Sequence, residues 1–181
     1  SADSHVTEPP NCYVDYIDPK FRDIAPHMAH NDEGGAQFVV HGMAMKIGMG
    51  GLAAAGVDPK QVKTNSAKFE EIHRGGWDPK ARIADQDVDG VGGEIVYPSI
   101  GMLICNHPDA DYKNACFNAY NRWLQEFQAG APGRIFGVGQ TAVRSVEEAI
   151  GDFQRIREMG FCGVMLPCDP ATEFDYDDPR F

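Results

Sequence analysis

The chain carries, at residues 134–167, the sequence RIFGVGQTAVRSVEEAIGDFQRIREMGFCGVMLP. Two apolar runs, residues 134–140 and 161–167, flank a segment that opens with the Ser-x-x-Glu spacing of Ser145 and Glu148. This spacing is typical of a capping box, in which side chains satisfy the free N–H groups of a helix start. The pattern predicts a strand, a helix that runs to about Met159 and ends at Gly160, and a second strand.

The same alternation extends toward the N-terminus. Residues 94–99 (EIVYPS) predict a short buried strand, and residues 111–128 predict a helix that Gly130 and Pro132 end. Its apolar residues recur at helical spacing: Tyr112, Cys116, Ala119, Tyr120, Trp123 and Phe127. Strands and helices that alternate with short connections require a parallel sheet. The predicted class is therefore α/β.

The first 76 residues differ in character from the rest. Residues 1–27 predict irregular structure after a brief extended start, because several prolines interrupt them. Residues 28–76 are rich in glycine and methionine, and we expect an insertion or flap there, with a strand or hairpin near residues 37–42. The whole chain, 1–181, is expected to form one domain. It offers about four strands, whereas a complete eight-stranded barrel takes about 250 residues.

Composition excludes several classes of partner. The 181 residues include 16 Lys and Arg against 27 Asp and Glu, which gives a net charge of −11. Nucleic acids and anionic membranes require a concentrated positive face, so neither is an expected partner. The sequence has no apolar run of about 18 residues and begins without the basic and apolar regions of a signal peptide. We therefore expect a soluble, cytoplasmic protein.

The five cysteines predict packed, reduced thiols. They are odd in number, widely spaced and form no CxxC pair. A disulfide framework would need a different pattern. The residues concerned are Cys12, Cys105, Cys116, Cys162 and Cys168.

The triplet Asp3-Ser4-His5 is the first candidate for chemistry. Residues two apart on a strand point to the same face, so the carboxylate of Asp3 and the imidazole of His5 could converge on one cation. This donor pair suits zinc, manganese or iron, although it is also common on plain surfaces. Three roles are open for Glu8: a further metal ligand, a hydrogen-bond partner of the metal ligands, or a carboxylate of a surface loop.

Other candidates follow predicted strands. Loops at the carboxyl ends of parallel strands are where α/β proteins place their sites. His107, Ser99 and Gln140 lie in such positions, with substrate contact and structural capping as the alternatives. His41 and His73 could reach a cleft if the glycine-rich segment folds over one, and the alternative for each is a polar loop residue. Motifs for nucleotide binding and for serine or HExxH catalysis do not occur in the sequence.

The chain resembles the amidohydrolase-related family, the branch of the amidohydrolase superfamily that contains aminocarboxymuconate-semialdehyde decarboxylase and related hydrolases. The resemblance covers nearly all of the chain in order, with residues 28–76 the least typical. The blocks that carry it are Asp3-Ser4-His5-Val6-x-Glu8-Pro9, Tyr16-Ile17-Asp18-Pro19-x-Phe21-Arg22-Asp23-x-x-Pro26, Arg82-x-x-Asp85-x-Asp87-x-Asp89-Gly90-Val91 leading to Tyr97-Pro98-Ser99, Tyr120-Asn121-x-Trp123-Leu124 and Gly160-Phe161-x-Gly163-Val164.

The resemblance implies a distorted (β/α)8 TIM-type barrel with one divalent metal at the carboxyl ends of its strands. It maps two ligands onto Asp3 and His5; zinc is preferred, and manganese or iron are alternatives. In the family a histidine from a middle strand and a late aspartate complete the site, and nothing after Leu166 supplies either one. We therefore expect the N-terminal portion of a longer barrel.

The function implied by the resemblance is hydrolysis of a small carboxylated or aromatic substrate by a metal-activated water. One alternative is a non-oxidative decarboxylase that uses the metal as a Lewis acid. Another is a catalytically incomplete binding module, which applies if the native chain ends at Phe181. Glu8, Ser99, His107 and Gln140 are the predicted contacts to substrate or ligands, and no residue is assigned as general acid or base. A small-molecule substrate and a homo-oligomer are the expected partners.

Overall fold

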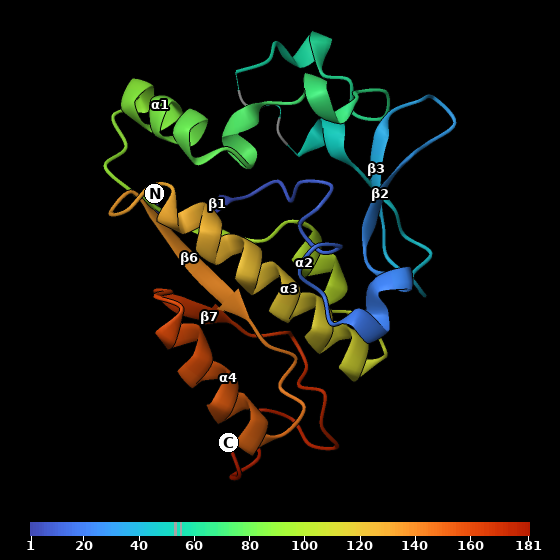
Figure 1. Ribbon diagram of the computed structural model, residues 1–181, viewed down its shortest axis with the longest axis vertical. Helices are drawn as coiled ribbons and strands as arrows, with labels where there is room; N and C mark the ends of the chain where they lie inside the picture. Colours follow the sequence, from blue (N-terminus) through green and yellow to red (C-terminus); the bar gives the residue numbers. More distant parts are fainter. Residues whose placement is uncertain (53, 55) are drawn as a thin grey trace.

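Four parallel strands form the main sheet of the computed structural model, which describes residues 1–52, 54 and 56–181 (Figure 1). The strands lie in the order β1 (Ser4–His5), β5 (Glu94–Tyr97), β6 (Ile135–Gln140) and β7 (Gly163–Met165). In register, His5 lies beside Tyr97, Val96 beside Gly137, and Gln140 beside Met165. The predicted α/β class with a parallel sheet is confirmed. The sheet is open, and the barrel implied by the family resemblance stays a prediction.

Four α-helices connect and cover these strands: α1 (Pro79–Asp89), α2 (Ile100–Ile104), α3 (Ala110–Ala129) and α4 (Val146–Glu158). Figure 1 shows α3 lying along β6, and α4 beside β7. The helices expected over 111–128 and 145–159 are therefore confirmed to within one or two residues. The short helix α2 and the eleven-residue helix α1 were not expected.

The aromatic face of α3 forms the centre of the core. Tyr112, Tyr120 and Leu124 are at most 1% exposed. At its start, the Asp109 carboxylate accepts hydrogen bonds from the N–H groups of Asp111 and Tyr112 at 2.9 and 3.0 Å. The helix therefore begins at a side-chain cap and is held mainly by burial of its apolar stripe.

Strand β6 approaches its covering helices so closely that it carries glycine. A Cβ at Gly137 would lie 2.8 Å from both Leu124 Cδ2 and Phe161 Cδ1. A Cβ at Gly163 of β7 would have no heavy atom within 4 Å. These two glycines therefore make a matched pair for testing how tightly the layers pack.

Replacing Gly137 by alanine is expected to lower the free energy of unfolding by about 1–3 kcal/mol, because the added methyl forces its neighbours apart. The control, Gly163→Ala, is expected to change it by less than about 0.5 kcal/mol. Urea unfolding of both variants measures the difference. Equal costs at the two positions would contradict the packing described.

A second, antiparallel sheet occupies part of the predicted insertion and lies on the right of Figure 1. Its strands follow the order β2 (His27–His30), β3 (Ala36–Val39) and β4 (Ile47–Gly48). The strand expected near residues 37–42 is present as β3, while β2 and the 3-10 turns between residues 49 and 76 were not expected. Phe38 and Met49 are fully buried and belong to the same core as α3. Residues 53 and 55 of the predicted insertion lie outside the described residues.

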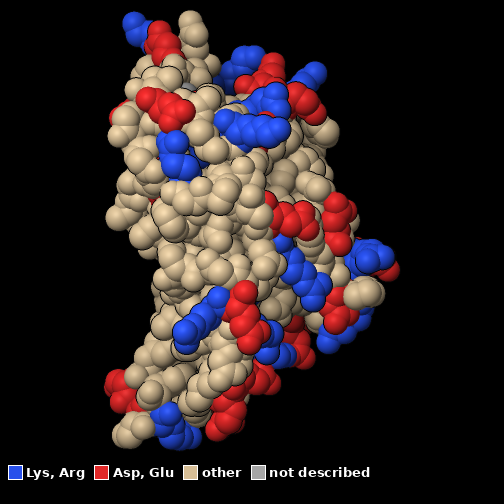
Figure 2. Space-filling model, turned by 60° about the vertical axis from the view of Figure 1, so that its left-hand side comes forward, with Lys and Arg blue, Asp and Glu red and all other residues tan. Residues whose placement is uncertain are grey.

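Two observations concern the outside of the protein: the distribution of charge on one face, and the length and hydropathy of the helices. Figure 2 shows a face on which acidic and basic side chains intermix above and below a broad uncharged area. Within the part of the chain that the structure describes, no helix is both long and apolar enough to cross a membrane.

Candidate functional site

Strand β1 places Asp3 and His5 side by side, as their spacing predicts. His5 Nε2 lies 3.6 Å from Asp3 Oδ1, and the two side chains are 42% and 84% exposed. Pairing with β5 fixes the backbone beneath them, with His5 beside Tyr97. The two donor atoms therefore converge at an accessible position where β1 ends.

The proton on His5 can be located from its neighbours. Nδ1 lies 2.8 Å from the carbonyl oxygen of Pro98, which can only accept a hydrogen bond, so Nδ1 carries the hydrogen. In the neutral ring, Nε2 then presents a lone pair toward the Asp3 carboxylate. Two electron-rich atoms facing each other fit either a second proton on the ring or a bound cation. A carbonyl holding the far nitrogen is the usual support of a metal-ligating histidine.

A cavity of about 470 Å³ adjoins His5. Leu52, Gly56 and Val88 contribute apolar or small surface, and the polar walls come from β1, α1 and the turn before α1. Its lining residues are His5, Thr7, Leu52, Gly56, His73, Gly75, Gly76, Arg82, Asp85, Val88, Asp89 and Glu94. The volume lies within the range of small-molecule sites.

Arg82 of α1 ties the walls of this cavity together. Its Nε donates to Glu94 Oε2 at 2.5 Å, and its Nη1 donates to the carbonyl oxygens of His5 at 3.1 Å and Gly75 at 3.2 Å. The side chains of Arg82 and Glu94 are each 13% exposed. Burial alone would raise the pKa of Glu94, but hydrogen bonds from Arg82, Gln86 and Ser4, together with the positive charge of Arg82, bring this pKa below its ordinary value.

Replacing Arg82 by methionine is expected to lower the free energy of unfolding by about 3 kcal/mol, because Glu94 would remain largely buried without its partner. Arg157→Met on the exposed side of α4 is the matched control, since Arg157 makes no ion pair among the described residues. The control is expected to cost less than about 0.5 kcal/mol. Chemical denaturation of the two variants measures both losses in the free energy of unfolding. Similar losses would contradict the role given to Arg82.

Glu8 lies away from the cavity, in the interior. It is 0% exposed, and its Oε1 accepts hydrogen bonds from the N–H groups of Ser99, Ile100 and Gly101 at 3.0, 2.9 and 3.1 Å. Ser99 Oγ donates to the carbonyl oxygen of Val6 at 2.7 Å. Glu8 and Ser99 thus join the end of β1 to the start of α2, and any role toward a substrate or ligand stays a prediction.

Burial raises the pKa of Glu8 above its ordinary value, although its backbone hydrogen bonds act in the opposite direction. The folded state therefore binds more protons than the unfolded state between the ordinary pKa of 4.5 and the folded pKa. The contribution of Glu8 to stability is thus fully present below the ordinary pKa and is lost as pH rises through the folded one.

Glu8→Gln, which cannot ionise, is expected to gain in stability relative to the unmodified protein as pH rises from about 4 to about 7. Denaturation midpoints of both proteins across this range measure the effect. A difference that stays constant, or that moves the other way, would contradict the raised pKa.

His107 and Gln140 are both buried and form hydrogen bonds to neighbouring parts of the chain. His107 is 5% exposed; its Nε2 lies 2.9 Å from the carbonyl oxygen of His41, and its Nδ1 accepts from the N–H of Asp109 at 3.1 Å. Gln140 is 1% exposed, its backbone pairs with the Asn121 amide, and it borders a separate cavity of about 350 Å³ between α3 and α4. Neither residue lines the cavity beside His5, so their predicted contact with substrate remains untested.

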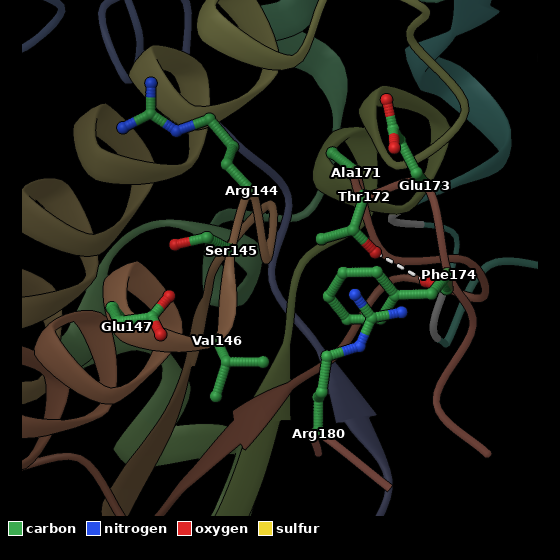
Figure 3. A pocket seen from close by; sticks show the side chains of 9 residues that line it. All are labelled: Arg144, Ser145, Val146, Glu147, Ala171, Thr172, Glu173, Phe174 and Arg180. Atoms are coloured by element: carbon green, nitrogen blue, oxygen red, sulfur yellow. Dashed lines mark hydrogen bonds between the residues drawn. The ribbon is translucent and has the colours of Figure 1, made fainter. Parts of the chain in front are cut away.

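Another cavity, of about 600 Å³, lies where α4 begins (Figure 3). It contains two guanidinium groups, but both already have partners within the chain. Arg180 pairs with Asp178 and stacks on the Phe174 ring at 3.4 Å from its centre. Arg144 pairs with Asp111 at 2.5 Å and with Glu148 at 2.7 Å. This cavity contains none of the predicted site residues, and we therefore place the candidate site beside His5.

The fit of a metal can be judged from the donors present. Asp3 and His5 supply a carboxylate oxygen and the imidazole Nε2, which lie 3.6 Å apart, while the carbonyl oxygen of Pro98 holds Nδ1. Within residues 1–52, 54 and 56–181, no group of three or more His, Cys, Asp or Glu side chains is arranged to hold a metal ion. The pair therefore fits two positions of a metal site, and the described residues do not complete it.

Sequence reasoning did not foresee that His73 and Asp85 would pair. His73 Nε2 lies 2.7 Å from Asp85 Oδ2, and both residues line the cavity beside His5. The two are twelve positions apart and separated by a tight turn, so no strand or helix spacing links them. The glycine pair Gly75-Gly76 was a usable signal, because glycine allows the backbone to approach another segment closely. A Cβ at Gly75 would overlap Asp85 Oδ2, and a Cβ at Gly76 would lie 2.5 Å from Thr7 Oγ1.

Comparisons with known proteins bear on the fold. No protein-family model and no curated protein matches the chain. Among solved structures, it is similar to the crystal structure of an amidohydrolase from Mycobacterium avium subsp. paratuberculosis K-10, with a TM-score of 0.69 and 20% sequence identity. The match covers 95% of this chain and 49% of that one, so this chain spans about half the length of the similar structure. The chain therefore has an amidohydrolase-type fold.

Proposed function

We propose that the protein is a metal-dependent hydrolase of the amidohydrolase type, acting on a small carboxylated or aromatic molecule. The observation that carries this proposal is the Asp3–His5 pair, in which a carboxylate oxygen and an imidazole lone pair converge 3.6 Å apart while Pro98 holds the far ring nitrogen. The likeness to a solved amidohydrolase supports it at the level of the fold.

Asp3 and His5 would hold one divalent ion, with zinc preferred over manganese or iron for this donor pair. When bound, such an ion supplies either a water of lowered pKa or a Lewis acid that polarises a substrate oxygen. The remaining ligands would come from outside the described residues, in a longer form of the protein.

The residues around the cavity beside His5 would bind and position the substrate. The cavity beside His5, about 470 Å³, has room for a small molecule. Arg82, bound to Glu94 and to the carbonyl oxygen of His5, would keep β1 and α1 in fixed relation around that cavity.

The test is metal-dependent turnover by the full-length protein. The metal is removed with a chelator, and zinc, manganese or iron is restored. A panel of small carboxylated and aromatic amides, esters and lactones is then followed by proton release. Restored metal is expected to raise hydrolysis at least about 100-fold. Turnover that survives metal removal unchanged would contradict the proposal.

The same panel distinguishes the main alternative. If aromatic carboxylic acids release carbon dioxide only when metal is present, the function is that of a decarboxylase and not of a hydrolase. A chain that binds these compounds but converts none of them would be a binding module.

A further inference from the structure

We propose that His73 and Asp85 form an acid–base dyad that serves the cavity beside His5. The sequence assigns no general acid or base, and the pair is not part of the predicted metal site. The inference rests on the proposed hydrolytic function, because a dyad of this kind moves the protons of a hydrolysis.

The geometry of the pair is that of a positioned imidazole. His73 Nε2 lies 2.7 Å from Asp85 Oδ2, and since a carboxylate only accepts, Nε2 carries the hydrogen. Nδ1 makes no hydrogen bond within residues 1–52, 54 and 56–181, so its lone pair is free. A histidine held at one nitrogen by a carboxylate and free at the other is the arrangement of a general base.

The local backbone keeps the two side chains together. His73 directly precedes the 3-10 turn of residues 74–76, and Asp85 lies on α1. Gly75 sits against the pair, where a Cβ would overlap Asp85 Oδ2 and come within 3.3 Å of His73 Nε2. The absence of a side chain at Gly75 therefore makes room for the bond.

Stabilisation of the fold does not by itself explain the His73–Asp85 pair. The side chains of His73 and Asp85 are 43% and 41% exposed, and ion pairs at such exposure stabilise a fold by at most about 1 kcal/mol. The imidazole instead borders the same cavity as His5 and Thr7. The titratable and charged groups that line this cavity with it are His5, Arg82, Asp85, Asp89 and Glu94.

The proton balance of the step is simple. As the oxygen of a water bonds to the substrate carbonyl carbon, one water proton moves to His73 Nδ1. The Nε2–H bond stays intact, and the Asp85 carboxylate remains ionised and stabilises the imidazolium. When the bond to the leaving group breaks, that proton moves from Nδ1 to the leaving atom, and the imidazole returns to its neutral form.

The test uses the full-length protein and 4-nitrophenyl acetate as the probe ester. His73→Gln retains an N–H group for Asp85 but cannot take up a proton, and it is expected to lower kcat about 100-fold with little change in KM. Asp85→Asn is expected to lower kcat about tenfold. His30→Gln, at an exposed position of β2 outside the cavity, is the control and should leave the rate unchanged.

A second measurement does not depend on variants. Diethyl pyrocarbonate acylates unprotonated imidazoles, and its sites can be located by mass spectrometry. Loss of esterolysis is expected to follow modification of His73 and not that of His30. Full activity after complete modification of His73 would overturn the dyad, as would a His73→Gln rate within twofold of the unmodified protein or no esterolysis above the buffer rate.

Metal analysis of the same samples separates the two proposals. His73→Gln with unchanged zinc content and slow esterolysis supports the dyad. Esterolysis that depends on His73 in a protein that binds no metal would retain the dyad and refute the metal-dependent function.

Discussion

Replacing Glu8 by alanine is expected to lower the free energy of unfolding by about 4 kcal/mol. The Glu8 carboxylate is completely buried, and one of its oxygens accepts three main-chain N–H groups, from Ser99, Ile100 and Gly101. Alanine removes the acceptor and leaves these donors in the interior without a partner. Each such buried donor costs about 1–3 kcal/mol when it stays unsatisfied, and partial access of water reduces the sum.

The conservative variant is the control for this effect. Glu8→Gln keeps an oxygen in place of Oε1 and is expected to cost about 1 kcal/mol or less near neutral pH. Both free energies follow from urea unfolding at one pH. An alanine variant that loses less than about 1 kcal/mol would show that the three N–H groups find other acceptors, and the described join between β1 and α2 would be wrong.

The elements that sequence patterns predict best are those whose signals are local. The apolar residues of α3 recur at helical spacing and end at Gly130, so its bounds follow from the sequence alone. At the start of α4, Ser145 Oγ accepts from the N–H of Glu148 at 3.1 Å, which is half of the predicted capping box. Such signals depend only on neighbours within a few residues.

The elements that were missed depend on distant partners. Helix α1 has few apolar residues, and one of them, Val88, is 87% exposed. It is held by a cap at Asp78, a left-handed turn at Gly90, and the contacts of Arg82 with β1 and β5. Strand β2 forms only because β3 pairs with it. Neither kind of support leaves a periodic pattern in the sequence.

The candidate site shows the same division. The convergence of Asp3 and His5 follows from the alternation of side chains along a strand, and the structure places them as expected. The burial of Glu8 depends on an N–H cluster more than ninety residues away, which no local pattern reveals. Position at the end of a strand says less about the site, because Gln140 is 1% exposed and borders a cavity other than the one beside His5. Its contact with substrate stays a prediction.

Removing the two predicted metal ligands is expected to have the largest effect on function. The doubly substituted protein, Asp3→Asn with His5→Gln, loses both the charge and the imidazole that would hold the ion. Loss of a single supporting partner around a ligand already costs about 10–100-fold in metal affinity. We therefore expect the double substitution to weaken zinc binding by more than about 100-fold, while His30→Gln leaves it unchanged.

Zinc content measured on the full-length protein, with the double variant and the His30→Gln control beside it, tests the central claim most directly. Elemental analysis is expected to find about one divalent ion per chain in the unmodified protein and the control, and none in the double variant. A double variant that retains one ion per chain would contradict the assignment of Asp3 and His5, and with it the proposed metal-dependent function.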